Sequence, residues 1–415
     1  MTTSSANSTD RVGNPLRQAG RTQGAVLLLG SSLTVVGAAM IAPVLPKLGA
    51  EFGPVDPQAN LLVPLVITGP ALAIAVFAPV AGGLADRLGR KGLLVLATLA
   101  YALLGVLPAL LSELSSIVGA RLLFGCAEAA VMTCCTTLIA DYWHGERRLR
   151  YINLQVICIA LIGSLFFVVG GVLGEYGWRT PFYLYLLPLL LVPAMLRVLW
   201  EPAARHAPPA AMDADATVDA STLVVGYLLV FFGMLLSFIV PVQTPALLVG
   251  LGVSSSTLIG LSAGLGLLTT LGGSLLWPLL RRLLGIPATN AALLALLALG
   301  LWLLAGAQTY AQVLVAVSVH GLGAGLLVPN AMTPVMNALP RRVRGRGMGG
   351  FTSSLYLGQF ASPLLIAALV PAGDGLHGAI RLAAAAACDR RAVDGGVAAP
   401  PGVCIFHRFA SEVTA

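Results

Sequence analysis

Residues 82–91 read Gly-Gly-Leu-Ala-Asp-Arg-Leu-Gly-Arg-Lys, and they link the apolar run 61–85 to the apolar run 93–111. Each run approaches or exceeds the ~20 apolar residues that a helix needs to cross a bilayer. A turn made basic by membrane topology alone would explain the three basic residues, but not Asp86 or the glycines on either side of it. The stretch therefore indicates a membrane protein with a specialised loop between two spans.

The overall composition supports a membrane protein. Of the 415 residues, 57% are hydrophobic and 10% are charged, whereas a soluble domain has roughly 25% charged residues. So few charges cannot cover the exterior of a soluble protein, and the outer surface must face lipid. Lipid-exposed backbone has to satisfy its own hydrogen bonds, which favours helices. A β-barrel would alternate apolar and polar residues and give a more polar sequence.

Eleven apolar runs divide the chain. They cover 24–45, 61–85, 93–111, 116–140, 152–174, 182–199, 222–248, 258–280, 286–306, 311–339 and 348–371. We expect residues 1–23 to be a disordered cytoplasmic N-terminus and residues 200–221 to be a cytoplasmic linker. The predicted domains are a bundle of six helices over 24–199, a second bundle over 222–371 and an atypical tail over 372–415.

The basic residues predict the orientation. Loops rich in Lys and Arg stay in the cytoplasm, and with the N-terminus inside, seventeen of these residues fall on the inner side. Only Lys47 and Arg179 fall in outer loops. This asymmetry explains the net charge of +7, so no nucleic-acid partner is needed. A bacterial inner (plasma) membrane protein with several spans and a cytoplasmic N-terminus is expected.

The two halves of the sequence resemble one another. Residues 45–53 align with 244–252 at an offset of 199, and Arg147-Arg148-Leu149-Arg150 aligns with Arg341-Arg342-Val343-Arg344 at an offset of 194. Matches at nearly one offset indicate parallel repeats of six helices. Such repeats place a substrate site near the middle of the membrane, between two bundles that rock against each other.

The loop at 82–91 resembles the signature loop of the major facilitator superfamily, Gly-x-x-x-Asp-Arg-x-Gly-Arg-Lys. Three other stretches resemble motifs of that family in helices 4, 5–6 and 11: residues 121–125 with Ala129, residues 170–173 with 177–179 and Phe182, and residues 358–360 with Pro363. The resemblance covers about 24–371. It implies an all-α integral membrane fold of two pseudo-symmetric six-helix bundles, with the twelfth helix missing or altered, and a transporter of the bacterial drug or metabolite type.

The resemblance also implies roles for the loop. Asp86 would face the start of helix 11 near Gly349 and Gly350, where exposed amides favour an anion. Arg90 would pair with Asp141 at the end of helix 4. These contacts would form a gate that sets conformational populations without touching substrate. The expected gate residues are Gly82, Asp86, Arg87, Gly89, Arg90, Lys91 and Asp141.

Arg121 and Glu128 are charged residues well inside a predicted span. A charge at the membrane centre costs about 2.5–3.5 kcal/mol on insertion scales. Their spacing of seven residues puts both on nearly the same side of a helix, which we expect to face the interior. Glu128 would gain and lose a proton, with Arg121 tuning it; alternatively, the two form a static polar clamp. His320 suits proton handling, although a lone helical histidine is commonly just hydrogen-bonded.

Four amide side chains are candidates for contact with substrate. They are Gln155, Gln243, Asn330 and Gln359. The alternative is that they act as hydrogen-bonding links between helices, as neutral amides do in membranes.

The predicted function is secondary active transport of a small organic solute by alternating access, with proton-coupled export. No phosphate-binding loop or catalytic constellation is present, so an enzyme, a cofactor and a metal site are not expected. The expected partners are the solute, protons and the lipid bilayer, and the chain is expected to be a monomer. Drug antiporters of the family carry Gly-Pro-x-x-Gly-Gly in helix 5, whereas residues 166–171 keep only the glycine pair. Proton-coupled uptake of a metabolite, a non-transporting receptor and a defective carrier stay open.

The tail departs from the six-plus-six pattern. Its longest apolar candidate, Leu376 to Cys388, has thirteen residues, which is shorter than a bilayer crossing. One hypothesis is that a reading-frame shift removed the last helix, and the alternative is a chain with eleven spans.

Overall fold

The computed structural model describes residues 19–202, 219–340 and 343–388, without the side chains of Asp86 and Cys388. Every regular element in these ranges is a helix, so the predicted all-α fold is confirmed. The predicted N-terminal lead and central linker lie largely outside the described residues.

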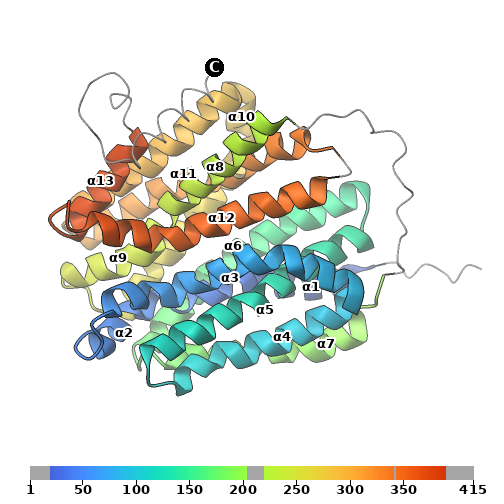
Figure 1. Cartoon of the computed structure of the whole chain (residues 1–415), viewed down its shortest axis with the longest axis horizontal. Coiled ribbons are helices and arrows are strands. Elements are labelled where there is room, and N and C mark those ends of the chain that lie inside the picture. The colour runs from blue at the N-terminus through green and yellow to red at the C-terminus, as the bar shows by residue number, and fades with distance from the viewer. Residues whose placement is uncertain (1–18, 203–218, 341–342, 389–415) are drawn as a thin grey trace, which may run out of the picture.

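The first half of the chain contributes the blue-to-green helices in Figure 1. They are α1 (Arg21–Ala39), η1 (Ala42–Val44), α2 (Leu45–Phe52), α3 (Ala59–Leu88), α4 (Arg90–Val106), η2 (Leu107–Leu110), α5 (Leu114–Tyr142), α6 (Gly145–Gly174), η3 (Thr180–Leu190) and α7 (Leu191–Val198). The second half contributes α8 (Ala220–Ser237), α9 (Ile239–Gly250), α10 (Ser256–Gly306), α11 (Tyr310–Ala338), α12 (Arg344–Leu369) and α13 (Leu376–Cys388). Ten helical segments of the described residues are long and apolar enough to cross a membrane.

Helix α10 holds two of the eleven predicted spans. Its 51 residues would measure about 77 Å as one straight helix, far more than the ~30 Å bilayer core. The helix is interrupted at Gly285, where φ is 76° and ψ is 179°. Gly273 packs against Leu322 of α11, and Gly300 packs against His320 of the same helix. The chain therefore folds back at Gly285, and both limbs of α10 lie along α11.

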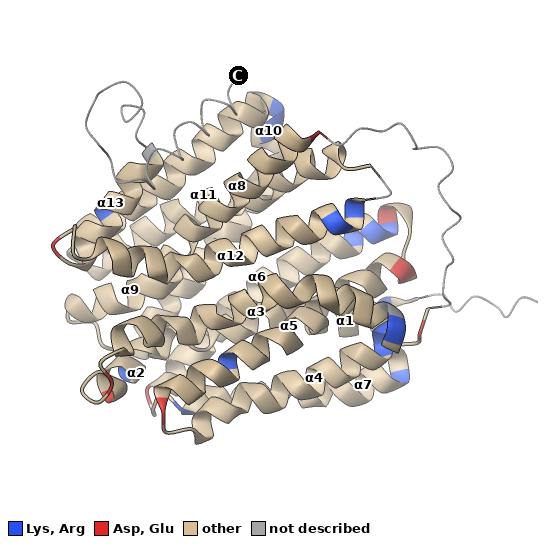
Figure 2. Cartoon of the chain, in the orientation of Figure 1, with Lys and Arg blue, Asp and Glu red and all other residues tan. Residues whose placement is uncertain are grey.

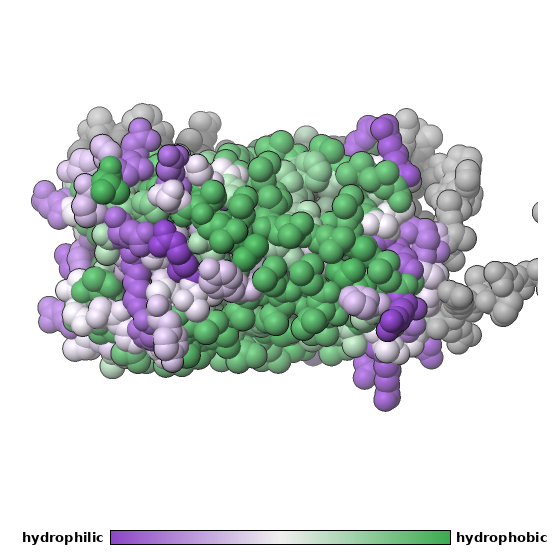
Figure 3. All heavy atoms as spheres, turned by 90° about the horizontal axis from the view of Figure 1, so that it is seen from below, coloured by the Kyte–Doolittle hydropathy of each residue, from purple (hydrophilic) through white to green (hydrophobic). Residues whose placement is uncertain are grey.

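The helices form a body with an apolar belt and two polar ends (Figure 3). One end, which we call the basic end, collects the ends of α3, α5 and α7 and the starts of α1, α4, α6 and α12. The other, the opposite end, collects the turns after α2, α6, α9 and the second limb of α10. Lys and Arg gather mainly at the basic end (Figure 2). Two separate hydrophobic clusters lie between the ends, one built almost wholly from the first half of the chain and one from the second.

The two halves meet along two helix pairs, α6 with α10 and α3 with α12. The buried residues of α6 all lie between Ala160 and Gly174, toward the opposite end, and none lies in its first turns. Gly171 and Gly260 mark close backbone approaches of α6 and α10 in that part of the interface. The halves are therefore in contact from the middle of the molecule to the opposite end and splay apart toward the basic end.

Helix α13 covers the thirteen residues that the sequence marks as the longest candidate in the tail. It packs against α10, and His377 Nδ1 lies 3.0 Å from the carbonyl oxygen of Ala305. The rest of the tail lies outside the described residues.

Candidate functional site

Arg121 and Glu128 both project from α5 into the protein. Arg121 has no exposed surface, and Glu128 is 5% exposed. Seven residues make about two turns of helix, so the two side chains leave α5 on nearly the same side. Their surroundings differ, however, and this difference decides what each can do.

Arg121 is held by groups from three other elements. Its Nη2 donates to the carbonyl oxygen of Gly37 in α1 at 2.6 Å, and its Nε donates to that of Val66 in α3 at 3.0 Å. Nη1 lies 3.3 Å from the hydroxyl of Tyr185 in η3, and the guanidinium carbon lies 4.2 Å from the centre of the Phe124 ring. Hydrogen bonds of this kind compensate a buried cation for its lost hydration. Arg121 therefore clamps four helical elements of the first half together.

Glu128 lacks such partners. Within the described part of the chain, no hydrogen bond or ion pair to its carboxylate is found, from Arg121 or from any other residue. Its oxygens are not sealed from solvent in the way that the orphaned hydroxyls of Ser237 and Ser362 are. One oxygen lies close to Gly37 of α1. The arrangement is a nearly buried carboxylate that keeps a small solvent exposure.

A tyrosine from the other half of the molecule approaches Glu128. Tyr356 of α12 lies within electrostatic range of the carboxylate, and its hydroxyl contacts the sulfur of Met132 at 3.3 Å. Close by, the hydroxyl of Ser353 donates to the carbonyl oxygen of Ala75 at 2.7 Å. Glu128 thus lies at the seam between the two halves. Tyr356 was not predicted as a site residue, because one tyrosine in an apolar run has no signal that separates it from a lipid-facing residue.

His320 occupies the position in the second half that Arg121 occupies in the first. It is 3% exposed and hydrogen-bonds to the backbone carbonyl of Leu236 in α8. Arg121 and His320 are 199 residues apart, and so are their partners Gly37 and Leu236. The same offset of 199 aligns residues 45–53 with residues 244–252. The Nε2 atom of His320 is buried and has no partner among the described residues.

Two of the four candidate amides form hydrogen bonds between helices, and the other two have no hydrogen-bond partner among the described residues. Gln155 Nε2 donates to the hydroxyl of Ser31 at 3.0 Å, which joins α6 to α1. Asn330 accepts from Trp277 Nε1 at 3.1 Å and donates to the side-chain oxygen of Asn290 at 2.6 Å.

Trp277 and Asn290 lie on either side of Gly285, so Asn330 ties the two limbs of α10 together. Gln243 and Gln359 are 8% and 9% exposed, and among the described residues neither has a hydrogen-bond partner for its amide.

The loop at 82–91 forms the turn between α3 and α4. Gly89 has φ 84° and ψ 143°, a backbone conformation that favours glycine. The Arg90 guanidinium forms an ion pair with Asp141 at the end of α5. Arg87 is exposed and Gly82 has open space beside it. The side chain of Asp86, and with it the expected contact to Gly349 and Gly350, lies outside the described residues.

Glu201, which was not predicted as a site residue, caps the start of α4. Its carboxylate accepts from the backbone N–H groups of Arg90 at 2.7 Å and Lys91 at 2.8 Å. An anion at a helix N-terminus is stabilised by the helix dipole. Lys91 Nζ donates to the carbonyl oxygen of Leu196 in α7 at 2.8 Å. The turn is thus tied to the last helix of the first half.

A second carboxylate, Glu175, links the two halves at the opposite end. It follows α6 and accepts from the Ser255 hydroxyl at 2.6 Å and from the Thr257 backbone N–H at 2.9 Å, at the start of α10. Lys47 of α2 lies 3.5 Å from its other oxygen. These hydrogen bonds lower the pKa of Glu175 from 4.5 to about 2, with a smaller contribution from Lys47. No sequence pattern signals this contact, because its partners lie some 80 residues away.

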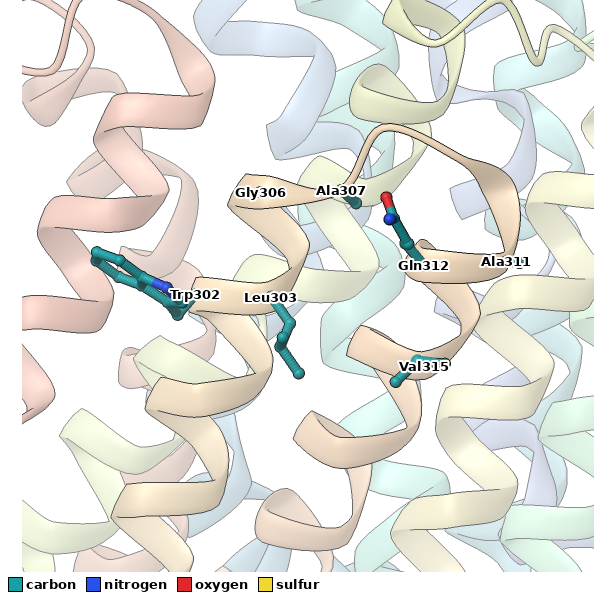
Figure 4. Close-up of a pocket in the computed structure, with 7 residues that line it drawn as sticks. All are labelled: Trp302, Leu303, Gly306, Ala307, Ala311, Gln312 and Val315. Carbon is teal, nitrogen blue, oxygen red and sulfur yellow. The ribbon is translucent and has the colours of Figure 1, made fainter.

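A depression of about 380 Å³ lies between the second limb of α10 and α11 at the opposite end (Figure 4). Its lining comprises Trp302, Leu303, Gly306, Ala307, Ala311, Gln312 and Val315. All seven residues belong to one half of the chain, and none of the predicted site residues is among them. It is therefore a surface feature, separate from the seam at Glu128. No group of His, Cys, Asp and Glu side chains suited to a metal occurs among the described residues.

Comparisons with known proteins found similar membrane transporters in both sequence and structure. The sequence profile of the Major Facilitator Superfamily matches residues 27–363. The 3-(3-hydroxy-phenyl)propionate transporter of Escherichia coli is 28% identical over 318 residues, which are 74% of this chain and 77% of that protein. The multidrug efflux pump LfrA of Mycolicibacterium smegmatis is 28% identical over 48% of this chain, a match that spans only 39% of the pump.

A crystal structure of a D-xylose–proton symporter superposes with a TM-score of 0.73 at 16% identity, covering 89% of this chain and 97% of that one.

Proposed function

The chain belongs to the major facilitator superfamily, and on that premise we propose that it exports a small organic solute across a membrane by alternating access, coupled to proton entry. The observation that carries the proposal is Glu128, a buried carboxylate at the seam of the two halves with no protein partner among the described residues. A buried charge without partners is costly, so this group favours an arriving proton or ligand. Relatives of the chain include a multidrug efflux pump, which supports export.

The proposed cycle follows from the packing of the halves. In this conformation the bundles of the first and second halves touch from their middle to the opposite end and splay at the basic end. By the positive-inside rule the basic end faces the cytoplasm, so the site opens inward. Solute enters from that side, displaces the proton on Glu128, and leaves after the halves rock to the other arrangement. The ion pair of Arg90 with Asp141 and the cap from Glu201 keep the 82–91 turn rigid while the basic end closes.

Proton flux in everted membrane vesicles tests this function. In vesicles that carry the protein and are acidified inside by respiration, transported solutes should dissipate the pH gradient, detected with a pH-sensitive dye. Glu128→Gln should abolish the response, because an amide cannot exchange a proton at this position. Glu113→Gln is the matched control: it makes the same change at an exposed residue at the start of the same helix.

Two outcomes of this assay contradict the proposal. Wild-type coupling in Glu128→Gln would remove the role of that residue. No solute-dependent proton movement across a broad panel of metabolites and drugs would favour a membrane receptor or a defective carrier.

A further inference from the structure

The three phenols around Glu128 all direct their hydroxyl groups elsewhere. Tyr101 donates to the carbonyl oxygen of Leu33 at 2.7 Å, and Tyr185 donates to that of Gly37 at 2.6 Å. Tyr356 directs its hydroxyl to the sulfur of Met132, which is a weak acceptor. None of the three donates to the carboxylate, although all lie within its electrostatic range.

The guanidinium of Arg121, which is the cation near Glu128, cannot be reached by a ligand. Arg121 has no exposed surface, and each of its three nitrogens has an acceptor within the protein. Apart from the exposed Arg381 of α13, the other Lys and Arg side chains of the described helices lie near helix ends or beside the turn at Gly285. A solute that reaches the seam therefore meets the negative charge of Glu128, with no accessible positive charge from the described helices beside it.

The walls near Glu128 suit an apolar, polarisable body. Tyr356 supplies an aromatic ring from the second half, and Met132 supplies a flexible thioether from the first. Aromatic faces attract organic cations, and methionine adapts its shape to varied ligands. Because the two side chains come from different halves, a solute held between them would feel any change in their relative position.

We propose that the site at Glu128 takes a monovalent organic cation with an apolar, aromatic body, and that it disfavours aromatic anions. This inference rests on the proposed transport function and assigns its substrate class. An anion would put like charges side by side in a poorly hydrated place, where charge–charge interactions are strong.

An organic cation and a proton compete for the carboxylate of Glu128, which cannot hold both at once. The titratable and charged groups that face Glu128 are Arg121 of α5, Tyr101 of α4, Tyr185 of η3 and Tyr356 of α12. Of these described groups, only the carboxylate can bind a cation directly, because Arg121 is fully buried and the phenols are neutral. Binding of the cation should therefore weaken as the pH is lowered and Glu128 becomes protonated.

A pair of probes with the same shape and opposite charge tests the assignment. Tetraphenylphosphonium and tetraphenylborate differ chiefly in the sign of their charge. Binding of each to the full-length protein in nanodiscs, above partition into empty nanodiscs, is measured by equilibrium dialysis over a range of pH from acidic to neutral. We expect saturable binding of tetraphenylphosphonium that tightens as pH rises, and no saturable binding of tetraphenylborate.

Three variants locate the binding. Glu128→Gln should weaken tetraphenylphosphonium binding by about tenfold or more, a loss of about 1.4 kcal/mol or more, and remove its pH dependence. Tyr356→Ala should also weaken binding, whereas Tyr356→Phe keeps the aromatic face and should bind like the wild type. Glu113→Gln is the control for each measurement.

Saturable binding of tetraphenylborate that matches or exceeds that of the cation would overturn the assignment. Unchanged cation binding in Glu128→Gln would overturn it as well. If aromatic anions drive proton movement in the vesicle assay and cations do not, the substrate class is wrong while the transport function stands. If neither class gives flux, the transport function itself fails.

Discussion

Two charged side chains on one helix have opposite environments. The guanidinium of Arg121 is bonded to backbone carbonyls of α1 and α3 and to Tyr185, whereas the carboxylate of Glu128 has no such partner among the described residues. The two roles considered for this pair, a static clamp and a proton-exchanging acid, therefore belong to different residues. We assign the clamp to Arg121 and the exchange to Glu128.

Replacement of Arg121 by methionine should destabilise the protein. The change removes a fully buried cation, leaves Tyr185 and the carbonyl oxygen of Val66 without this donor, and takes one of two donors from the carbonyl oxygen of Gly37. We expect a loss of about 3 kcal/mol or more in unfolding free energy, measured by thermal unfolding in detergent. Arg179→Met is the control, because Arg179 pairs with Glu51 at the surface, where an ion pair contributes about 0–1 kcal/mol. Equal shifts in the two variants would contradict the clamp.

At the residue scale, sequence reasoning could go only part of the way. The spacing of seven residues predicted that Arg121 and Glu128 share a side of the helix, because helical periodicity is local. It could not predict that they stay unpaired, since that depends on acceptors that α1, α3 and η3 bring from elsewhere in the chain. Tyr356 and Glu175 were missed for the same reason: their partners Met132 and Ser255 are distant in sequence.

Among the helices, α10 shows how one glycine sets the path of the chain. Gly285 takes a backbone conformation that L side chains rarely adopt, and Asn330 joins Trp277 and Asn290 across the turn. The hydropathy pattern predicted a break between 280 and 286, because apolar runs end where a loop leaves the membrane. The geometry of the turn and its tie to α11 were beyond that pattern.

Gly285→Ala should destabilise the turn by about 1–2 kcal/mol, because a Cβ at positive φ crowds the backbone. Thermal unfolding in detergent measures the effect. Gly306→Ala is the control, since Gly306 has ordinary backbone angles and open space beside it. An equally small effect at both glycines would mean that the turn relaxes without strain.

On the scale of the whole molecule, the opposite end is held by polar contacts and the basic end is open. Glu175 joins α6 to the start of α10, whereas Gly82, Gly345 and Gly349 near the basic end each have open space where a methyl side chain would stand. Small residues let helices approach closely. We interpret these glycines as the surface on which α3 and α12 close when the molecule changes its opening.

The Glu175 contact should be insensitive to pH through the physiological range. Its pKa lies near 2, below the ordinary 4.5, so its contribution is complete above the ordinary pKa and is lost only as the pH falls through the lowered one. Glu175→Ala should open the opposite end at neutral pH. Spin labels at the exposed residues Val55 and Gln308 measure the distance between the halves there. Glu51→Ala is the control, because the hydrogen bonds of Glu51 join it to residues of its own half. A wild-type distance distribution in Glu175→Ala would exclude a latch.

The sealed guanidinium of Arg121 also determines how membrane voltage acts on the proposed cycle. Its positive charge stays with the first half in every step, so an ionised Glu128 makes the pair neutral, and a bound proton or cation leaves a single net positive charge. Moving one such charge through 100 mV changes the energy by about 2.3 kcal/mol. An interior-negative voltage therefore favours reorientation of the occupied, positively charged site toward the cytoplasm. It should speed proton entry and oppose cation exit. The empty carrier, whose site is neutral, should not respond to voltage.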